Sequence, residues 1–406
     1  MYNIKLEKYI PAPKPATSDR IVAAHYYAAW KKGAAVLHDA FNDLADEYPE
    51  RTPLMGYYDE ENPEVTDWEI KWALEHGINC FIHCWYRYQH NMGKPVTKAD
   101  LRCAHGLHEA LFNAKYGNMM KFAIMFECSE RWSGTDEHDM LDNLMPFWME
   151  NYFKRENYLV IDNKPVLFVY SNRLETDSFP DKETQRRTFD ACREYAKKCG
   201  FDGMFFAKQY SIGGVTKESY DDMMTRGYDF SFGYTSGFSI PNKATATEAE
   251  VVEGQLNAFK NRLALDPMRN ISTASCAWAP EPRKRQHWRD LGFHYHDLWG
   301  GTWWLSPESF RKVIAGLRQM CDALPDGAWG KRMIMLDNWN EWDEGHFIAP
   351  NHKYGFGHLQ AIREELAARD NLPEYRTPAD QGFGGYNNSW RTPDFKDFCE
   401  NLLEKI

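Results

Sequence analysis

Residues 333–344 read MIMLDNWNEWDE, an apolar run followed at once by crowded acidic, amide and indole side chains. The run 333–336 has the length of a buried strand. Asp337, Glu341, Asp343 and Glu344 then place four carboxyl groups within eight residues, interleaved with tryptophan. Carboxylates this close repel one another, so some are expected to have raised pKa values. A protonated carboxyl beside an ionised one is a general acid–base pair, and with indole rings for stacking the stretch indicates a carbohydrate site. The alternative is a solvated loop whose acids cap the next helix.

The same pattern of an apolar run closed by polar and aromatic residues recurs upstream. Helical segments alternate with these runs; Thr66 and Glu69 make a plausible capping box in the first, over 63–75, and Ser306-Pro307 starts a later one. Eight strands alternating with helices predict a single-domain α/β protein, a (β/α)8 TIM barrel. A doubly wound open sheet is the alternative, but no strand is followed by Gly-x-Gly-x-x-Gly. The expected strands are 21–27, 78–86, 121–126, 165–170, 203–207, 228–232, 271–278 and 331–336, and the expected helices are 63–75, 98–115, 140–153, 183–199, 220–225, 244–263, one from 306, and 357–369.

A barrel carries its chemistry at the carboxyl ends of its strands. The polar and aromatic clusters fall there, although each tryptophan by itself is more often part of the core. The residues predicted to bind substrate are His25, Tyr26, Tyr27, Trp30, His83, Trp85, Tyr86, Glu130, Trp132, Tyr170, Gln209, Tyr234, Trp278, Asn340 and Trp342.

Glu341 and Glu344 are the predicted catalytic pair. Glu127 and Glu130, after the third strand, are rival acids, and either could pair with a carboxyl of the final loop. The spacing of three residues leaves retaining and inverting geometry open, because it does not give the carboxyl separation. The histidines form no ligand pair beside an acid, so no catalytic metal is expected. No nucleophile elbow or Walker loop is present.

Composition narrows the class of protein. The 406 residues carry a net charge of −11, which argues against nucleic acid or an anionic membrane as the main partner. Nine cysteines, an odd number, predict free thiols in a reducing compartment. No apolar run is long enough to span a membrane, and the N-terminus lacks an apolar signal core. We therefore expect a cytoplasmic protein, with a periplasmic or surface location if a leader has been removed.

The expected organisation is a catalytic barrel over residues 20–370, flanked by two smaller segments. An extended arm is expected over 1–19, and a strap with a short terminal helix, packed on the barrel, over 371–406. No linker divides the chain into two domains.

The final loop resembles the Asn-Glu-Trp-x-Glu-Gly signature of the WbsX-like proteins, relatives of glycoside hydrolase family 99, the endo-α-mannosidases. In this chain it reads from Asn340 to Gly345 and is followed by Tyr354-Gly355. The resemblance spans about residues 20 to 365. Two positions differ from the family, with Ser129 replacing asparagine and Asn163 replacing glycine. Further similar segments are His25-Tyr26-Tyr27-x-x-Trp30, Gly77-Ile78-x-x-Phe81, Trp85-Tyr86, Ser129-Glu130-x-Trp132, Tyr158-Leu159 through Lys164-Pro165-Val166, and Ser306-Pro307-x-x-Phe310.

The resemblance implies a (β/α)8 barrel and a retaining glycosidase that needs no metal or cofactor. It implies Glu341 as the base that deprotonates the sugar's own 2-hydroxyl, which attacks C1, and Glu344 as the general acid/base. The expected substrate is an α-mannoside-like or related polysaccharide or glycan, cleaved internally. Two alternatives stay open, because fold does not determine function. One is a glycosyltransferase or transglycosylase of surface polysaccharide (O-antigen) synthesis, and the other is a non-catalytic sugar-binding protein.

Overall fold

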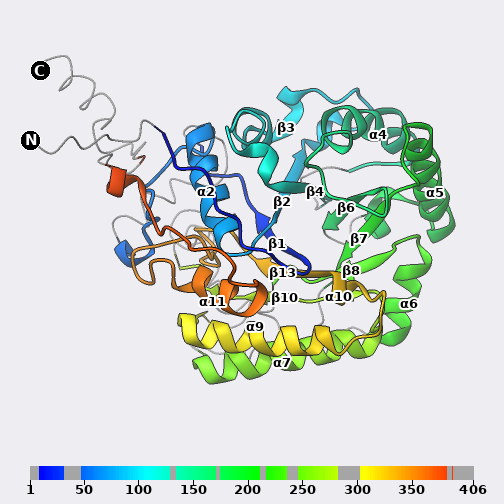
Figure 1. The fold of residues 1–406 in the computed structure, drawn as a ribbon. Coiled ribbons are helices and arrows are strands. Elements are labelled where there is room, and N and C mark those ends of the chain that lie inside the picture. Colours follow the sequence, from blue (N-terminus) through cyan, green and yellow to red (C-terminus); the bar gives the residue numbers. More distant parts are fainter. Residues whose placement is uncertain are drawn as a thin grey trace, which may run out of the picture.

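The computed structural model shows a parallel strand ring surrounded by helices (Figure 1). It describes residues 9–31, 47–128, 134–170, 174–210, 216–235, 246–281, 302–381 and 386. Each strand of the ring pairs in parallel with the next along the chain, and the last, β13, returns to the first. The strands are β1 (Ile21–Tyr26), β2 (Cys80–Arg87), β4 (Lys121–Glu127), β6 (Lys164–Tyr170), β7 (Phe205–Gln209), β8 (Phe230–Phe232), β9 (Asn270–Ile271), β10 (Thr273–Ser275) and β13 (Met333–Asp337).

The ring closes through β9 and β10, which are two parts of one chain segment separated by Ser272. β9 pairs with β8, and β10 pairs with β13. The described strands therefore fill eight positions, which confirms the predicted (β/α)8 barrel. The predicted strand 271–278 was too long, because the chain leaves the ring after Ser275. It then forms β11 (Ala277–Trp278), which pairs antiparallel with β12 (Trp303–Trp304).

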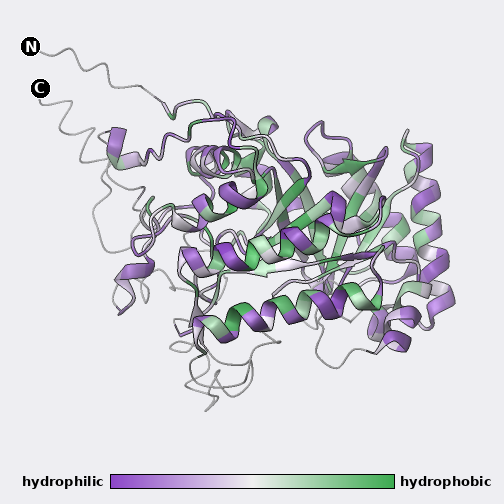
Figure 2. Cartoon of the chain, turned by 60° about the horizontal axis from the view of Figure 1, so that its bottom comes forward, coloured by the Kyte–Doolittle hydropathy of each residue, from purple (hydrophilic) through white to green (hydrophobic). Residues whose placement is uncertain are grey.

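The principal helices pack on the outside of the ring with their apolar stripes inward. In α5 the buried positions recur every three or four residues, and Phe189 stacks on Phe206 of β7 with ring centroids 3.9 Å apart. Figure 2 shows the result, with strands mostly green and the outer sides of helices mostly purple. α9 packs between α7 and α11. The bounds are α2 (Pro63–Glu75), α5 (Lys182–Lys198), α6 (Lys217–Thr225), α7 (Glu248–Leu265), α9 (Pro307–Asp322) and α11 (Gly357–Leu366).

The helix predicted over 63–75 is confirmed as α2, and the predicted cap of a later helix is also right. Ser306 caps α9, and its hydroxyl accepts the amide of Ser309. The predicted Thr66–Glu69 capping box was wrong, because α2 begins one turn earlier, at Pro63. Its cap is Asn62, and Pro63 at the first position needs no hydrogen-bond acceptor. Glu69 is thus an interior helix residue, buried against the barrel.

The helix predicted over 98–115 is broken into short pieces. Cys103 has φ 62°, outside the helical region, and a side chain at Gly106 would meet Ala28 at 2.6 Å. The pieces are η3 (Lys98–Asp100), β3 (Leu101–Arg102), which pairs antiparallel with β2, and the π-helical η4 (Gly106–Leu111). The helix predicted over 140–153 is present as a continuous run of α3 (Glu137–Asp139), η6 (Met140–Leu144), α4 (Met145–Trp148) and η7 (Met149–Phe153).

The remaining elements are short. No helix among the described residues is long and apolar enough to cross a bilayer. The terminal helix expected near residues 393–406 lies outside the described residues. The short elements are β5 (Val160–Ile161), which pairs with β6, α10 (Trp329–Arg332), η1 (Pro49–Arg51), η2 (Gln89–Asn91), η5 (Gly117–Met119), η8 (Leu174–Ser178) and η11 (Pro378–Gln381).

Candidate active site

The loop after β13 carries both predicted catalytic acids at the carboxyl end of the barrel. It folds back on itself: the amide of His346 donates to the carbonyl of Glu341 at 3.2 Å. Gly345 makes the turn with φ 66°, and a side chain there would lie 2.2 Å from the carbonyl oxygen of Ala279. Only glycine fits this close approach. Glu341 is 2% exposed, whereas the side chain of Glu344 is 16% exposed and faces a more open environment.

Side chains inside the loop anchor it to the barrel rather than to solvent. Asn340 donates to Glu60 at 2.7 Å and accepts the amide of Tyr27 at 2.9 Å. Its carbonyl accepts the indole N–H of Trp30 at 2.8 Å. The indole of Trp342 donates to Tyr58 at 2.9 Å and is 1% exposed. The three residues predicted to bind sugar here, Trp30, Asn340 and Trp342, are therefore placed as supports of the loop.

A buried pair of carboxyls on the neighbouring elements lies beneath this loop. Glu69 of α2 accepts the indole N–H of Trp339 at 2.9 Å and the hydroxyl of Tyr26 at 2.7 Å. Burial, with the nearby charge of Glu60, raises the pKa of Glu69 to about 8. Burial likewise raises the pKa of Glu60. Raised carboxyl pKa values were expected within the loop, and the structure places two such groups in its support.

The inward face of the strand ends surrounds Glu341. Burial and the charge of Glu341 raise the pKa values of Tyr27, Cys84 and Tyr234 well above their usual range. The ring of Tyr170 lies 5.0 Å from that of Tyr234, whose hydroxyl accepts the side-chain amide of Asn338 at 2.8 Å.

Glu127, at the end of β4, extends the same inward face. Burial, with the charge of Glu127, raises the pKa values of Tyr170 and Tyr86. The two tyrosines, like Tyr27 and Tyr234, were predicted substrate contacts. The rival acid Glu127 thus lies with Glu341 at the carboxyl-end opening of the barrel, which we call the mouth. Tyrosine hydroxyls lie close to it.

Three predicted substrate contacts point the other way, into the layer between sheet and helices. The hydroxyl of Tyr26 reaches α2, as described above. The ring of His83 packs 4.4 Å from Tyr26, and burial lowers the pKa of His83 to about 3, so it is neutral. The indole of Trp85 donates to Tyr152 at 3.0 Å and packs against Trp148 of α4. Tyr26, His83 and Trp85 therefore lie outside the barrel. A sugar bound at the carboxyl end of the barrel would meet the inward-facing side chains instead.

The other predicted contacts divide between the mouth and undescribed residues. His25 points inward, its ring 4.8 Å from that of Tyr234, and burial lowers its pKa to about 4. Gln209 ends β7, and Trp278 lies with its ring 5.1 Å from that of His346. Glu130 and Trp132 lie outside the described residues, so they stay predictions.

Sequence reasoning did not select the residues that hold Glu344. His346 bonds Glu344 through one ring nitrogen and Asp337 through the other, each at 2.8 Å. The hydroxyl of Ser275 donates to the second oxygen of Asp337 at 2.8 Å. The available signal was a histidine two residues after the acid, across a glycine turn. Within the described ranges, no group of three or more acidic, histidine or cysteine side chains is arranged to hold a metal ion.

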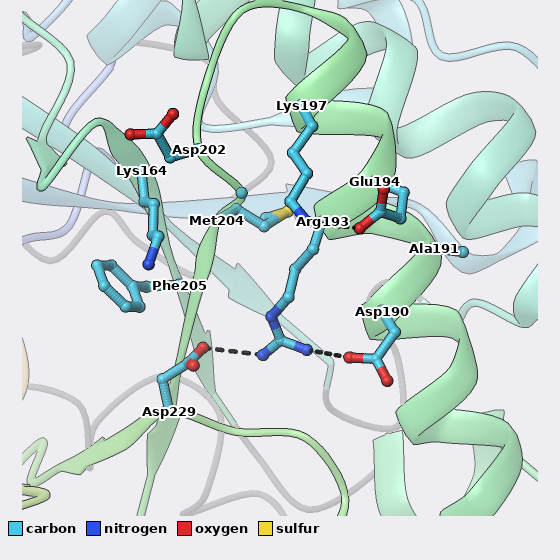
Figure 3. Close-up of a pocket in the computed structure, with 11 residues that line it drawn as sticks. Lys164, Asp190, Ala191, Arg193, Glu194, Lys197, Asp202, Met204, Phe205 and Asp229 are labelled. Atoms are coloured by element: carbon cyan, nitrogen blue, oxygen red, sulfur yellow. Dashed lines mark hydrogen bonds and ion pairs between the residues drawn. The ribbon is translucent and has the colours of Figure 1, made fainter.

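A separate cavity of about 430 Å³ lies at the opposite end of the barrel (Figure 3). It is lined where β6, β7 and β8 begin, by Lys164, Phe205 and Asp229 among others. Arg193 crosses it and pairs with Asp190 at 2.7 Å and with Asp229 at 2.9 Å. The cavity lies on the amino-terminal face of the barrel, whose residues generally contribute to stability rather than to catalysis. It is therefore not part of the candidate active site.

The family comparison covers most of the described barrel. The family model described as "Glycosyltransferase WbsX" matches residues 27–362. The chain belongs to the WbsX family. The protein described as "Uncharacterized protein WxcX" of Xanthomonas campestris pv. campestris is 23% identical over 381 residues, covering 87% of this chain and 49% of that protein. The chain thus spans about half the length of the curated relatives it matches.

Solved structures similar to this WbsX-family chain share its barrel. The GH99 endo-alpha-mannosidase of Bacteroides thetaiotaomicron, in complex with bis-tris-propane, aligns with a TM-score of 0.56 at 15% identity, covering 86% of this chain and 96% of that one. A structure described as a glycoside hydrolase-like protein aligns with a TM-score of 0.57 at 16% identity, covering 89% and 98%. At these identities the likeness establishes the fold.

Proposed function

We propose that this protein is a retaining glycoside hydrolase that cleaves an α-mannoside-like or related polysaccharide or glycan internally. Membership of the WbsX family and the barrel shared with GH99 structures support a carbohydrate-active enzyme. The observation that carries the finer proposal is the loop after β13. It holds Glu341 among inward tyrosines and Glu344 on the more exposed side of the same turn.

The proposed reaction assigns one role to each acid. Glu341 takes the proton of the sugar's 2-hydroxyl, whose oxygen attacks C1 and displaces the glycosidic oxygen. That leaving oxygen receives its proton from Glu344. Water, deprotonated by Glu344, then opens the 1,2-anhydro sugar at C1, and Glu341 returns its proton to the 2-oxygen. Two inversions at C1 retain the configuration.

The burial of the two acids suits these roles. Glu341 sits deep, where the excluded water strengthens its interaction with a bound hydroxyl. Glu344 keeps access to a leaving group and later to water. Tyr27, Tyr170 and Tyr234 offer hydroxyl groups around Glu341 for hydrogen bonds with sugar hydroxyls. No metal or cofactor enters this scheme.

A polysaccharide digestion screen tests the proposal. Wild type, Glu344→Gln and the exposed-histidine control His352→Gln would be incubated with α-mannans and other glycans, and released reducing ends measured. We expect release by wild type and the control, and a loss of about 10²- to 10⁴-fold in Glu344→Gln, the usual contribution of a general acid/base. Full activity in Glu344→Gln, or no release from any glycan by wild type, would contradict the proposal.

The family description favours a second function, transfer of a sugar in surface polysaccharide synthesis. A transferase would bind a sugar nucleotide, so calorimetric titration with a panel of nucleotide sugars distinguishes the two. Saturable binding together with an inert digestion screen would favour the transferase.

We further propose a cytoplasmic location, which the free thiols of the described cysteines support. Cell fractionation with a specific antibody would test it.

A further inference from the structure

We propose that His346, oriented by Asp337, is a positioning residue that holds the carboxyl of Glu344 and shares its catalytic proton. This inference rests on the proposed role of Glu344 as general acid/base. It concerns a hydrogen-bonded chain that runs from the buried end of β13 to the partly exposed acid. The chain is Ser275, Asp337, His346 and Glu344, and each of its three contacts measures 2.8 Å.

The proposal assigns the proton of the inner contact, between Asp337 and His346, to Nδ1 of the imidazole. Asp337 is fully buried, and one of its oxygens already accepts the hydroxyl of Ser275. Its other oxygen lies 2.8 Å from Nδ1 of His346. One oxygen of Asp337 is already engaged by the Ser275 hydroxyl, and the proposal places a proton on Nδ1, which donates to the other oxygen. This is how a second carboxylate commonly orients a functional histidine.

The outer contact of the chain, between Nε2 of His346 and Glu344, then holds one further proton. With Nδ1 protonated, Nε2 of a neutral ring is an acceptor, so the 2.8 Å contact with Glu344 requires a protonated carboxyl. In the alternative form the ring is a cation that donates to an ionised Glu344. The two forms differ only in the position of one proton between Oε2 and Nε2, so the pair titrates as a unit.

This arrangement does what an acid/base needs in both halves of the reaction. When the pair gives its proton to the leaving oxygen, Glu344 becomes the base that later takes a proton from water, and the pair is restored. Without the imidazole, the carboxyl would hold the proton alone and lose it at lower pH. The rigid ring, which is fully buried, also fixes the carboxyl in one orientation.

The histidine, tyrosine and tryptophan around the imidazole are weak competitors for this proton. His25 is held neutral by its burial, and Tyr234 keeps its hydroxyl proton at all accessible pH. Trp278 covers the ring and does not titrate. Among the described residues, the titratable groups near the His346–Asp337 pair include Glu344 from the loop itself, Glu341 across the turn, His25 from β1, Tyr170 from β6, Tyr234 after β8, and Cys276 after β10.

The first test needs no substrate. Imidazole ¹⁵N resonances of His346 would be assigned by their absence from His346→Gln and followed with pH in wild type and in Glu344→Gln. We expect a protonated Nδ1 throughout pH 5–8, and an Nε2 titration that moves by about one pH unit when Glu344 is neutralised, the order of shift an adjacent charge produces. Identical Nε2 titrations in the two proteins would overturn the proposal, whatever the activity.

The second test uses the glycan cleaved by wild type. His346→Gln should lower kcat by about 10- to 100-fold, leave KM within about threefold, and move the basic limb of the kcat–pH profile down by about one unit. Asp337→Asn, which keeps the shape but removes the charge that orients the ring, should produce a smaller shift in the same direction. His352→Gln should change nothing.

The outcomes separate this inference from the proposed function. A fall in kcat that is equal at every pH, with the basic limb unmoved, would leave His346 a merely structural role and overturn the inference. Coupled ¹⁵N titrations in a protein that cleaves no glycan would support the chain of contacts while the glycosidase proposal fails. If the His346→Gln protein does not fold, the kcat–pH profile of Asp337→Asn decides, and an unmoved basic limb there overturns the inference.

Discussion

Adjacent residues of β2 face two different environments. Cys84 and Tyr86 point inward, where the charges of Glu127 and Glu341 reach them. His83 and Trp85, one residue away, point outward, where His83 packs against Tyr26 of β1 and Trp85 against Trp148 of α4. The side-chain period of two in a strand makes this division unavoidable, since successive side chains alternate faces. Neighbouring aromatic residues at the rim of the barrel therefore have different roles. Those that face inward line the candidate site, and those that face outward pack against helices.

The largest expected effect comes from the outward face. Trp85→Ala should destabilise the protein by about 3–5 kcal/mol, because it leaves a large cavity and removes the bond to Tyr152. Chemical denaturation followed by fluorescence measures this change. The folded fraction should keep its activity within about threefold. The matched inward control is Tyr86→Phe, which should scarcely change stability. If Trp85→Ala proved as stable as wild type but inactive, the division of faces would fail.

Glu69, which supports the loop after β13, should make the free energy of unfolding depend on pH. The pKa of Glu69 is raised to about 8 from a usual 4.5, so the folded state holds a proton that the unfolded chain releases first. This contribution to stability is complete below about pH 4.5 and is lost as pH rises towards 8, with a slope of at most about 1.4 kcal/mol per pH unit. Glu69→Gln should flatten the decline of unfolding free energy over pH 5–8. An unchanged slope would place the titrating group elsewhere.

The smallest effect should come from a single inward hydroxyl. Tyr234→Phe removes the acceptor of the Asn338 amide and one hydroxyl near Glu341. The net stability change should be about 1 kcal/mol, the usual worth of one hydrogen bond. Activity on the glycan should fall about tenfold through kcat/KM, because a sugar hydroxyl loses its partner. Steady-state kinetics at several substrate concentrations measure it. Full activity would remove Tyr234 from the proposed binding mouth.

Much of the barrel was predictable because its signals are local. The strand predicted over 121–126, found as β4, and the Ser306-Pro307 helix start depend on residues close in sequence. One failure has a tertiary cause. The helix predicted over 98–115 gave way where Leu101 and Arg102 pair with β2, an earlier strand, and Cys103 takes a positive φ. The failure of the Thr66–Glu69 box has a local reason instead: Asn62 caps α2 one turn earlier, so Glu69 is an interior helix residue, and it bonds Trp339.

The candidate site divides in the same way. Glu341 and Glu344 stand out by density of charge within one loop, and a local pattern suffices to select them. Which aromatic residues at the strand ends face these acids depends on how side chains alternate along each strand. An error of one residue in placing a strand moves every side chain to the other face. Tyr26 and Tyr27 show this, since one supports the loop through Glu69 and the other lies beside Glu341.

By itself, the sequence determined the strand–helix alternation, the acid-rich loop after the last strand, and the family to which the chain belongs. Those depend on composition and order along the chain. Only the tertiary structure decided that Ser275, Asp337, His346 and Glu344 form one hydrogen-bonded chain. β10 and β13 are about sixty residues apart, and their side chains meet because the ring closes there, a juxtaposition that no local pattern encodes.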